Sequence, residues 1–567
     1  MRLVVYSSVA PQVLQHLLWR LALDLPEAQV AGVLYETARP PLSPARRVQR
    51  FARLLRDPQF VRYAVHTVGR GVAARGGRLF DGALRFVHAA PAEPNGPPLS
   101  LEALAAQWRE RGVAFHVTGD LHDAESLAFV RALGADLGLI YGTRILKPAL
   151  FAIPRRGSIN IHKHKLPDYR GGGAAGLWEM ADGCGEQTVT VHRVVEEVDA
   201  GAVLGERTIA IEPLDTLESV QMKADVVSVD LIVDVIRDEA LGRASERPQP
   251  PGGRLYKGCQ PHQQHAIECR IRAQRTPWRP TYMRPLLKRL ARLPFLPLQA
   301  VRNHRRRRTR SFPVIVLFQH LTADRPKRMA LPTAQFARHV RYLKKHYRIV
   351  SLDQAVELLK SGAVDVPTVV LTLDDGYADN FKGLRAIAEL EQVPFTVCVC
   401  TQHVSERSEL AHDVARGEHG FPSLGWDEVR YLDRHGVAIA SHTRTHFDCG
   451  TGDYARLMEE IAQSKRELEA ELGHPVTAFA FPKGMPQNIP PLANGIALQH
   501  YPIVLSAACG PNVAPMHPPM EIRRYGHPDS LLELELQVQE LLDPPVPPRP
   551  VPEGFAFPSA AVPSARG

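Results

Sequence analysis

Two long runs of alternating strand-like and helix-like segments most constrain how this chain can fold. The first run, from residue 1 to about residue 242, contains "RLVVYSS", "AQVAGVLY", "VAFHVTG", "DLGLIYG", "SINIHKH" and "TVTVHRV". The second begins at "FPVIVLFQH" and continues through "TVVLTLDDG", "PFTVCVC", "VAIASHT", "AFAFPKG" and "PIVLSAA". Strands that alternate with helices predict mostly parallel sheets covered by helices, so we expect an α/β protein with two cores.

The boundaries of these runs divide the chain into four parts. Its 567 residues exceed what a single hydrophobic core usually organises. Residues 246–310 are rich in Pro, Arg and Gln, which predicts an interdomain linker, and residues 543–567 form a Pro-rich tail that need not fold. We therefore expect one domain over residues 1–245 and a second over residues 311–542.

The net charge of +9 is unevenly distributed, because the segment "RNHRRRRTR" in the linker carries a large share of it. Apolar and basic residues at near-helical spacing leave three interpretations of the linker open, a solvated tether, a weak contact with an anionic membrane or a nucleic-acid-binding patch. We favour the tether and keep an anionic-membrane contact as the alternative. No nucleic-acid partner is expected, because the interleaved aromatic residues typical of single-strand binding are missing.

The expected location is cytoplasmic. Seven scattered cysteines do not suggest a disulfide framework and fit a reducing compartment. The first residues lack the basic region, apolar run and small-residue cleavage site of a secretory signal, and no apolar stretch is long enough to span a bilayer.

Two adjacent carboxylates end an apolar strand of the second run. Asp374 and Asp375 directly follow "TVVLTL", and neighbouring acids raise each other's cost of ionisation unless a cation offsets it. About seventy residues later another strand-like segment ends in His442 and His446. One carboxylate and two histidines at neighbouring strand ends predict a divalent metal site, with zinc as the preferred ion.

In this interpretation Asp375, His442 and His446 bind the metal, and Asp374 acts as the base that deprotonates water. Taken alone, the acid pair is more often a turn and the histidines are more often surface residues. Together they resemble the T-F-D-D-G and H-[ST]-x-x-H motifs of the polysaccharide deacetylase family (NodB homology, carbohydrate esterase family 4).

That resemblance covers about residues 311–542 and implies a distorted β/α barrel that hydrolyses N-acyl groups of amino sugars. The segment "FAFPKG" is similar to the third motif of the family and implies that a main-chain N–H near Lys483 serves the oxyanion.

The chain departs from the deacetylase pattern in three places. The Tyr-His pair of the first strand reads Phe318-Gln319 here, with a histidine displaced to His320. The arginine of the third motif, which orients the base in many members, is absent near Ala480. The late histidine that acts as the acid has three candidates, namely His500, His517 and His527.

A second group of polar residues lies in the first run, in "GSINIHKHKLPDYRGGG" and the segment after it. Asn160 and His162 are two apart on a predicted strand and therefore share a face, and Asp199 follows another strand. An amide, an imidazole and a carboxylate can stabilise an oxyanion, move a proton and raise imidazole basicity, as acyl transfer to an amine requires. On spacing alone, a single histidine on an apolar strand is more often structural.

The segment resembles the formyltransferase family that uses 10-formyltetrahydrofolate, whose pattern is N-x-H-x-S-L-L-P-x-Y-R-G followed by an aspartate in a D-x-G turn. Asn160, His162 and Asp199 occupy its catalytic positions, and Arg170 matches the arginine of the pattern. The resemblance spans about residues 1–245 and implies a Rossmann-like sheet, with Tyr141 near the folate and Arg170 as a substrate contact. The catalytic histidine is followed by His164 and Lys165 where the pattern has serine and leucine.

Within this family, "TVHRVVEEVDAGAVLGERTIAIEP" looks most similar to the sugar-amine formyltransferases. It looks less similar to the methionyl-tRNA enzymes, whose C-terminal β-barrel the linker cannot supply. The preferred hypothesis is a bifunctional enzyme that transfers a formyl group to a small-molecule or sugar amine and hydrolyses an N-acyl group, in either order. The competing hypotheses are a single-activity enzyme whose other half only binds, and a non-enzymatic adaptor built on the linker.

Overall fold

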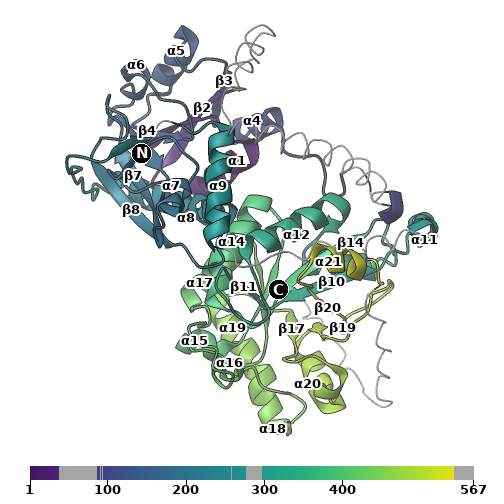
Figure 1. Cartoon of the computed structure of the whole chain (residues 1–567). Helices are drawn as coiled ribbons and strands as arrows, with labels where there is room; N and C mark the ends of the chain where they lie inside the picture. Colours follow the sequence, from purple (N-terminus) through teal and green to yellow (C-terminus); the bar gives the residue numbers. More distant parts are fainter. Residues whose placement is uncertain are drawn as a thin grey trace, which may run out of the picture. The chain divides into compact units, whose positions relative to one another are not determined.

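The computed structural model describes residues 1–37, 86–89, 91, 93–256, 258–275, 296–451 and 453–541 (Figure 1). The chain forms two compact units. The N-terminal unit comprises residues 1–77 and 97–279, and the C-terminal unit comprises residues 78–96 and 280–567.

The predicted four-part division stays a prediction. The Pro-rich tail at residues 543–567 and the middle of the predicted linker lie outside the described residues. The described parts of the linker contain regular structure, because residues 254–256 and 261–275 belong to the N-terminal unit and residues 296–309 to the C-terminal unit.

The elements of the N-terminal unit are β1 (Arg2–Ser7), α1 (Pro11–Asp24), β2 (Gln29–Glu36), α4 (Leu101–Arg109), β3 (Ala114–Thr118), α5 (Ala124–Leu133), β4 (Leu137–Tyr141), α6 (Pro148–Phe151), β5 (Ser158–His162), β6 (Tyr169–Gly171), α7 (Leu177–Ala181), β7 (Glu186–Arg193), β8 (Val203–Ala210), α8 (Leu217–Ala240), β9 (Arg254–Tyr256) and α9 (Pro261–Arg275). Each of the six quoted segments of the first run forms one of these strands.

The N-terminal unit is built on a seven-stranded sheet in the order β3-β2-β1-β4-β5-β7-β8. The strands from β3 to β5 are parallel, and β7 and β8 extend the sheet antiparallel to their neighbours. This doubly wound arrangement confirms the predicted Rossmann-like α/β fold. Two further strands, β6 and β9, pair in parallel outside this sheet. β6 belongs to the segment that resembles the formyltransferase pattern, and β9 lies near the start of the predicted linker.

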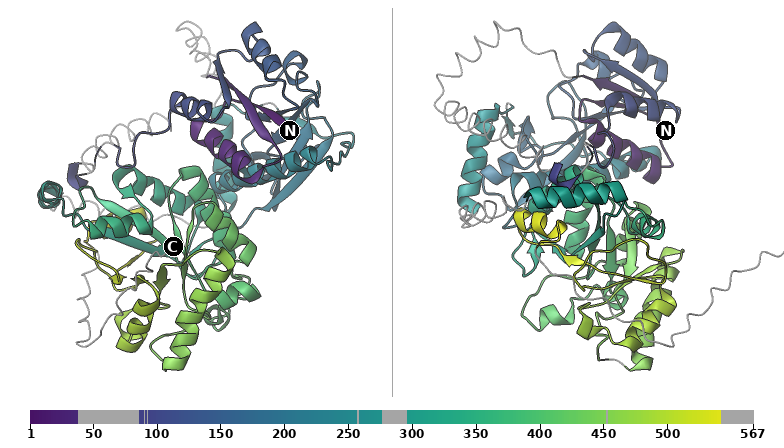
Figure 2. Two further views of the ribbon diagram at one scale, coloured as in Figure 1. Left: turned by 180° about the vertical axis from the view of Figure 1, so that it is seen from behind. Right: turned by 90° about the vertical axis from the view of Figure 1, so that its right-hand side faces the viewer.

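Both faces of this sheet are covered, which explains why its central strands are continuously apolar. Along β1, Leu3 and Val5 belong to the core shared with α1, α4 and α8, whereas Val4 and Tyr6 belong to the core shared with α5 and α6. Two further views show the strands of each unit lying among its helices (Figure 2).

The elements of the C-terminal unit are α11 (Leu296–Thr309), β10 (Val314–Gln319), β11 (Leu321–Thr322), β12 (Ala330–Leu331), α12 (Thr333–His346), β13 (Arg348–Ile349), α13 (Leu352–Lys360), β14 (Thr368–Leu373), α14 (Ala378–Glu391), β15 (Thr396–Val399), α15 (Thr401–Glu406), α16 (Ala411–Val414), α17 (Trp426–Arg434), β16 (Ala438–Ser441), α18 (Tyr454–Leu457), η2 (Met458–Gln463), α19 (Ser464–Leu472), β17 (Ala478–Ala480), η3 (Pro486–Asn488), α20 (Pro491–His500), β18 (Ile503–Leu505), β19 (Met520–Ile522), β20 (Tyr525–Gly526) and α21 (Leu531–Val538).

The C-terminal unit is built on a nine-stranded parallel sheet in the order β19-β18-β17-β16-β15-β14-β10-β20, with β13 also paired to β14. Its two outermost strands, β19 and β20, are separated in the chain only by Arg523 and Arg524. The two edges must therefore lie close together, so the sheet curves into an incomplete barrel, as the predicted distorted β/α barrel requires.

One face of this curved sheet forms a continuous apolar core. Alternate residues of neighbouring strands, including Val316, Val370, Cys398 and Ala440, belong to a single buried cluster. Because all the paired strands are parallel, their carboxyl ends meet at one mouth of the barrel, where polar side chains can converge. The part of the chain that the structure describes contains no helix both long and apolar enough to span a bilayer.

Candidate functional sites

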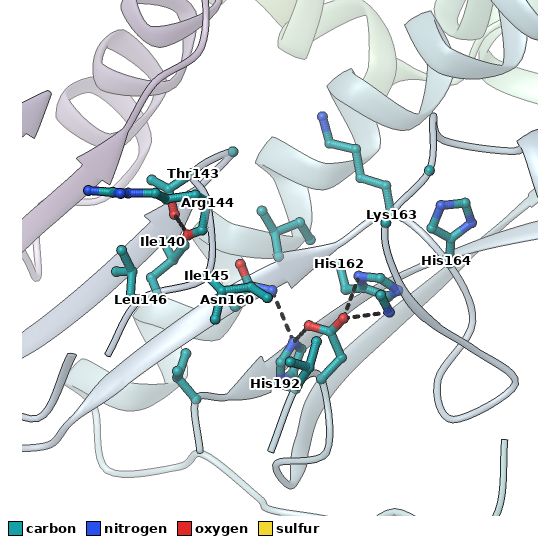
Figure 3. Close-up of a pocket in the computed structure, with 18 of the residues that line it drawn as sticks. Ile140, Thr143, Arg144, Ile145, Leu146, Asn160, His162, Lys163, His164 and His192 are labelled. Carbon is teal, nitrogen blue, oxygen red and sulfur yellow. Dashed lines mark hydrogen bonds and ion pairs between the residues drawn. The ribbon is translucent and has the colours of Figure 1, made fainter. Parts of the chain in front are cut away.

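A cavity of about 660 Å³ opens at the carboxyl ends of β4 and β5 in the N-terminal unit (Figure 3). Its walls include Asn160 and His162 from β5, His192 from β7, and Asp199 from the turn after β7. Residues 142–146 form the opposite side. The three residues predicted to be catalytic therefore line one cavity.

A single carboxylate connects two histidines of this cavity, His162 and His192. The Nδ1 atom of His162 lies 3.6 Å from Oδ2 of Asp199, and Nε2 of His192 lies 3.4 Å from Oδ1. The side-chain amide of Asn160 lies 3.1 Å from Nε2 of His192, and Figure 3 shows these side chains turned toward one another. His192 was not predicted, yet it pairs directly with Asn160 across β5 and β7.

The turn that carries Asp199 is tightly held. Its backbone is in the left-handed region at φ 51°, and the N–H of Gly171 donates to its carboxylate at 2.8 Å. A Cβ atom at Gly201 would lie 1.9 Å from the carbonyl oxygen of Arg193, so this position of the D-x-G turn requires glycine. Arg170 donates to the carbonyl oxygen of Val198 at 2.7 and 3.0 Å, which anchors the turn; its predicted substrate contact stays a prediction.

Burial and this network set the protonation states of the pair. Burial lowers the pKa of His162 to about 4, against the opposing attraction of Asp199. Burial alone would raise the pKa of Asp199, but the hydrogen bond from His192, the proximity of His162 and the Gly171 N–H bring it to about 2. Nε2 of His162 donates to the carbonyl oxygen of Tyr169 at 2.6 Å, so at neutral pH the lone pair of the neutral imidazole is at Nδ1, beside the carboxylate of Asp199, where it can accept a proton.

Tyr141, predicted to lie near the folate, is buried in the cavity wall at the end of β4. Lys163 lies 5.5 Å from the centre of its ring and forms an ion pair with Asp225. Burial raises the pKa of Tyr141 to about 12, so its phenol stays protonated. Its role toward a substrate stays a prediction.

In the C-terminal unit, Asp375, His442 and His446 converge at the mouth of the barrel. One possible ligand atom from each lies within 4.8 Å of the others. Oδ1 of Asp375 is 3.3 Å from Nε2 of His442 and 3.2 Å from Nε2 of His446. These are the three residues predicted to bind a metal.

The residues of this cluster fit a divalent cation. Nδ1 of His442 donates to the carbonyl oxygen of Ala480 at 2.8 Å, so its Nε2 presents a lone pair to Asp375. Oδ1 of Asp375 is buried and accepts no hydrogen bond among the described residues. Lone pairs that face one another repel, and a cation bound between them would remove that repulsion.

The backbone is strained at this cluster. Asp375, Thr443 and His446 adopt φ values of 73°, 64° and 56°, in a region that residues other than glycine rarely occupy. Such outliers persist only where the surroundings over-determine them, and they concentrate at functional sites.

The neighbouring carboxylate, Asp374, is held by an arginine that the sequence did not identify. Arg524, fully buried, donates from its two terminal nitrogens to Oδ1 and Oδ2 of Asp374 at 2.7 and 2.8 Å. It also donates to Thr372 and to the carbonyl oxygen of Ser506, each at 3.1 Å. Asp374 is therefore ionised and oriented by a two-pronged salt bridge.

The pKa of each acid is lowered despite burial. Burial would raise the pKa of Asp374, but the charge of Arg524 outweighs it and lowers the pKa. For Asp375 burial again acts upward, and the charge and hydrogen bond of His320 hold the pKa well below its usual range. Both carboxylates are thus available in their charged forms at neutral pH.

Two further imidazoles touch the rim of the cluster. Nδ1 of His320 donates to Oδ2 of Asp375 at 2.9 Å. The ring of His412, on α16, lies 4.7 Å from the ring of His446. Both side chains are partly exposed, at 27% for His320 and 30% for His412.

The three candidates for the late acid lie elsewhere. His527 is buried against His339, with 2.9 Å between their ring nitrogens. His517 is exposed in the loop before β19, and His500 ends α20. Among the described residues, no hydrogen bond or ion pair joins any of these three histidines to the acid pair.

Lys483 lies three residues after the end of β17. Its backbone φ is 58°, and its half-exposed ammonium group lies 2.8 Å from Oδ2 of Asp448, two residues after His446. The lysine is thereby tied to the loop that carries a candidate metal ligand. The predicted oxyanion contact of the main chain stays a prediction.

Comparison with known families assigns both regions. Residues 99–236 match the family model described as formyl transferase, and residues 361–491 match the model described as polysaccharide deacetylase. The first match contains Asn160, His162 and Asp199, and the second contains the acid pair and both histidines of the cluster. The chain carries a formyl transferase domain and a polysaccharide deacetylase domain. Both families consist of enzymes.

The formyl transferase domain has similar curated proteins. A methionyl-tRNA formyltransferase from Cyanothece sp. is 35% identical over 136 residues, which is 24% of this chain and 40% of that protein. Another from Phenylobacterium zucineum is 31% identical over 173 residues, or 30% of this chain and 56% of that protein. The chain thus spans about half the length of the curated relatives it matches.

Solved structures also resemble each domain. IcaB from Ammonifex degensii aligns over 40% of this chain and 97% of its own, at 20% identity and a TM-score of 0.35. The formyltransferase PseJ from Anoxybacillus kamchatkensis aligns over 29% of this chain and 82% of its own, at 23% identity and a TM-score of 0.24.

Three residues of the two sites, His192, His412 and Arg524, were not predicted from the sequence. A signal for His192 was present, because it lies near the end of the strand that leads to Asp199. Arg524 lies outside both matched regions and about 150 residues from Asp374, and no spacing rule connects the two. His412 lies in the connection between β15 and β16 and had no motif.

Proposed function

We propose that the protein is a bifunctional enzyme that acts on N-acyl groups of amino sugars. The formyl transferase domain would transfer the formyl group of 10-formyltetrahydrofolate to a sugar amine, and the deacetylase domain would hydrolyse an N-acyl group with a divalent metal, preferably zinc. The observation that carries the proposal is that each domain gathers the polar residues of its own family pattern at its strand ends.

In formyl transfer, neutral His162 would accept a proton from the amine as its nitrogen attacks the formyl carbon. Asp199 would stabilise the imidazolium that forms, and the amide of Asn160 would donate to the developing oxyanion. The bond from the formyl carbon to N10 of the folate would then break, with return of the proton from His162 to N10. The low pKa of His162 supports this cycle, because it keeps the base free at neutral pH.

In the deacetylase domain, Asp375, His442 and His446 would hold the cation, which when bound supplies Lewis acidity at the mouth of the barrel. Asp374, oriented by Arg524, would take a proton from the attacking water. The leaving amine needs a proton in return, and the rim imidazoles of His320 and His412 are close enough to the cluster to supply it.

The sugar class is favoured by the combination of the two domains. A polysaccharide deacetylase domain and an amine formyltransferase domain share one chemical group, an N-acylated sugar amine. The curated relatives are named for methionyl-tRNA instead, so this acceptor is the alternative to test. No β-barrel follows the formyl transferase domain in the described parts of residues 246–310.

We also propose that the reactions occur in the cytoplasm. All seven cysteines are described, and all are free thiols. Free thiols persist in a reducing compartment. The order of the two reactions is left to the assay.

A mass-spectrometric assay tests the function. Purified full-length protein would be incubated with free and N-acetylated hexosamines, their nucleotide-linked forms and methionyl-tRNA, with and without 10-formyltetrahydrofolate and a chelator. We expect a formamide product on sugar amines and chelator-sensitive release of acetate or formate.

His162→Gln and Asp375→Asn provide internal controls, since each should remove one reaction and spare the other. Formylation of methionyl-tRNA alone would replace the sugar proposal. If the chelator does not affect formylation and no hydrolysis is detected, the deacetylase domain would be assigned the role of a binding module.

A further inference from the structure

A second buried histidine and carboxylate pair lies in the wall of the formyl transferase cavity. Nδ1 of His164 lies 3.0 and 2.9 Å from the two carboxylate oxygens of Glu179. Both side chains are 3% exposed. The proposed mechanism does not use this pair, and the formyltransferase pattern has serine where this chain has His164.

Nε2 of His164 has no hydrogen-bond partner in the part of the chain that the structure describes. Because the Glu179 carboxylate accepts from Nδ1, the hydrogen-bonding capacity of the ring that remains is at Nε2. That atom is buried and makes no hydrogen bond among the described residues. A buried polar atom without a partner costs free energy, and in a binding site a ligand is the usual source of compensation.

His164 is positioned for contact with a substrate. It lines the catalytic cavity with Asn160 and His162, and its ring centre lies 5.2 Å from that of His162 (Figure 3). A molecule whose amine reaches His162 would therefore bring its neighbouring groups to His164.

The surroundings keep His164 in place. The hydroxyl of Thr190 donates to its carbonyl oxygen at 3.1 Å, and the amide of Gln187 donates to the carbonyl oxygen of Lys163 at 2.8 Å. Glu179 lies on α7. The N–H of Cys184, which follows this helix, donates to the carbonyl oxygen of Glu179 at 2.8 Å. A side chain held from both sides is preorganised to bind one geometry of ligand.

We infer that His164, oriented by Glu179, binds the acceptor by accepting a hydrogen bond at Nε2 from a hydroxyl group next to the reacting amine. The ligand class is a hydroxylated amine, and this inference rests on the proposed formyl transfer to sugar amines. His164 is a specificity residue, and Glu179 is its positioning residue.

The test compares two amines on six-membered rings, D-glucosamine and cyclohexylamine, which lacks the hydroxyl groups, at saturating 10-formyltetrahydrofolate. Full-length protein carrying His164→Ser is expected to show a KM for D-glucosamine raised about tenfold, the effect of one lost hydrogen bond. The rate with cyclohexylamine and the KM for the folate should stay unchanged. Glu179→Gln should give a smaller change in the same direction.

Two variants keep the result interpretable. His164→Ser alone leaves Glu179 buried without its partner, so the double variant with Glu179→Ala removes that charge and should retain the same amine selectivity as the single variant. Lys165→Leu is the matched control, because this exposed neighbour also departs from the pattern but does not line the cavity.

Equal losses with both amines, or an altered KM for the folate, would overturn the inference and assign the pair a structural role. Formylation of neither amine by the unmodified protein would overturn the proposed function, and the inference with it.

Discussion

The formyl transferase cavity and the deacetylase cluster each combine histidines with an aspartate, but the two carboxylates differ in how many partners they have. In the cavity, the carboxylate of Asp199 is shared between His162, His192 and the N–H of Gly171. In the cluster, Oδ1 of Asp375 faces two imidazoles and accepts no hydrogen bond among the described residues. The first arrangement suits proton transfer, and the second suits a cation.

The same comparison extends to how each base is kept ready. His162 is neutral because burial disfavours its charged form, whereas Asp374 is charged because Arg524 outweighs its burial. One site thus relies on exclusion of water and the other on a fixed opposite charge.

Loss of the cation site should produce the largest effect. Asp375→Asn removes the charged oxygen between His442 and His446, so we expect metal content to fall and hydrolysis to drop at least about a thousandfold. Formyl transfer should be unchanged. Elemental analysis and acetate release measure the two outcomes, with the exposed Asp365→Asn as control. If Asp375→Asn lost its metal but kept full hydrolysis, the proposed cation role of the cluster would be wrong.

Removal of the proposed base His162 should have the opposite effect, loss of formyl transfer without loss of hydrolysis. His162→Gln is expected to lower formyl transfer by about a hundredfold to ten-thousandfold while hydrolysis continues, because the amine loses its proton acceptor. Quantitative mass spectrometry of the formamide product measures this loss. His116→Gln, a substitution on β3 outside the cavity, is the matched control and should leave both rates unchanged.

A conservative change at Arg524 should have a smaller effect. Arg524→Lys keeps the charge beside Asp374 but loses the two-pronged contact, so we expect hydrolysis to fall about tenfold to a hundredfold with metal content intact. Arg523→Lys is the neighbouring control. Loss of metal in Arg524→Lys would show that the arginine supports the cluster itself and does not only orient the base.

The smallest predicted effect is on pH dependence. When calculated per concentration of unprotonated amine, the rate of formyl transfer should remain flat from neutral pH to about pH 5 and fall toward pH 4, where His162 becomes protonated. As the pH falls, His162 takes up its proton near pH 6.5 in the unfolded chain but only near pH 4 in the folded protein. His162 thus contributes stability above pH 6.5 that is lost as the pH falls to about 4.

Chemical denaturation of the wild type and His162→Gln between pH 7 and pH 4 measures this contribution. We expect the difference in the free energy of unfolding to shrink by about 1.4 kcal/mol per pH unit across the window. A difference that does not vary with pH would mean that His162 is protonated in the folded state as readily as in the unfolded chain.

The sequence by itself determined the class of fold and the first members of each site. Apolar strand runs with helical segments between them permit few arrangements besides parallel α/β sheets, and every strand segment quoted from the sequence is a strand in the structure. Asn160 with His162, and Asp374 with Asp375, are close in the chain, so local geometry brings each pair to a strand end.

Only the tertiary structure decided how each site is completed. Arg524 reaches Asp374 because it lies in the link between β19 and β20, the two edge strands of the curved sheet. The order of the strands in the sheet therefore determines this contact. His192 meets Asn160 through the antiparallel register of β5 and β7, and Glu179 meets His164 through the docking of α7. These contacts depend on register and closure, which a single sequence does not encode in its spacing.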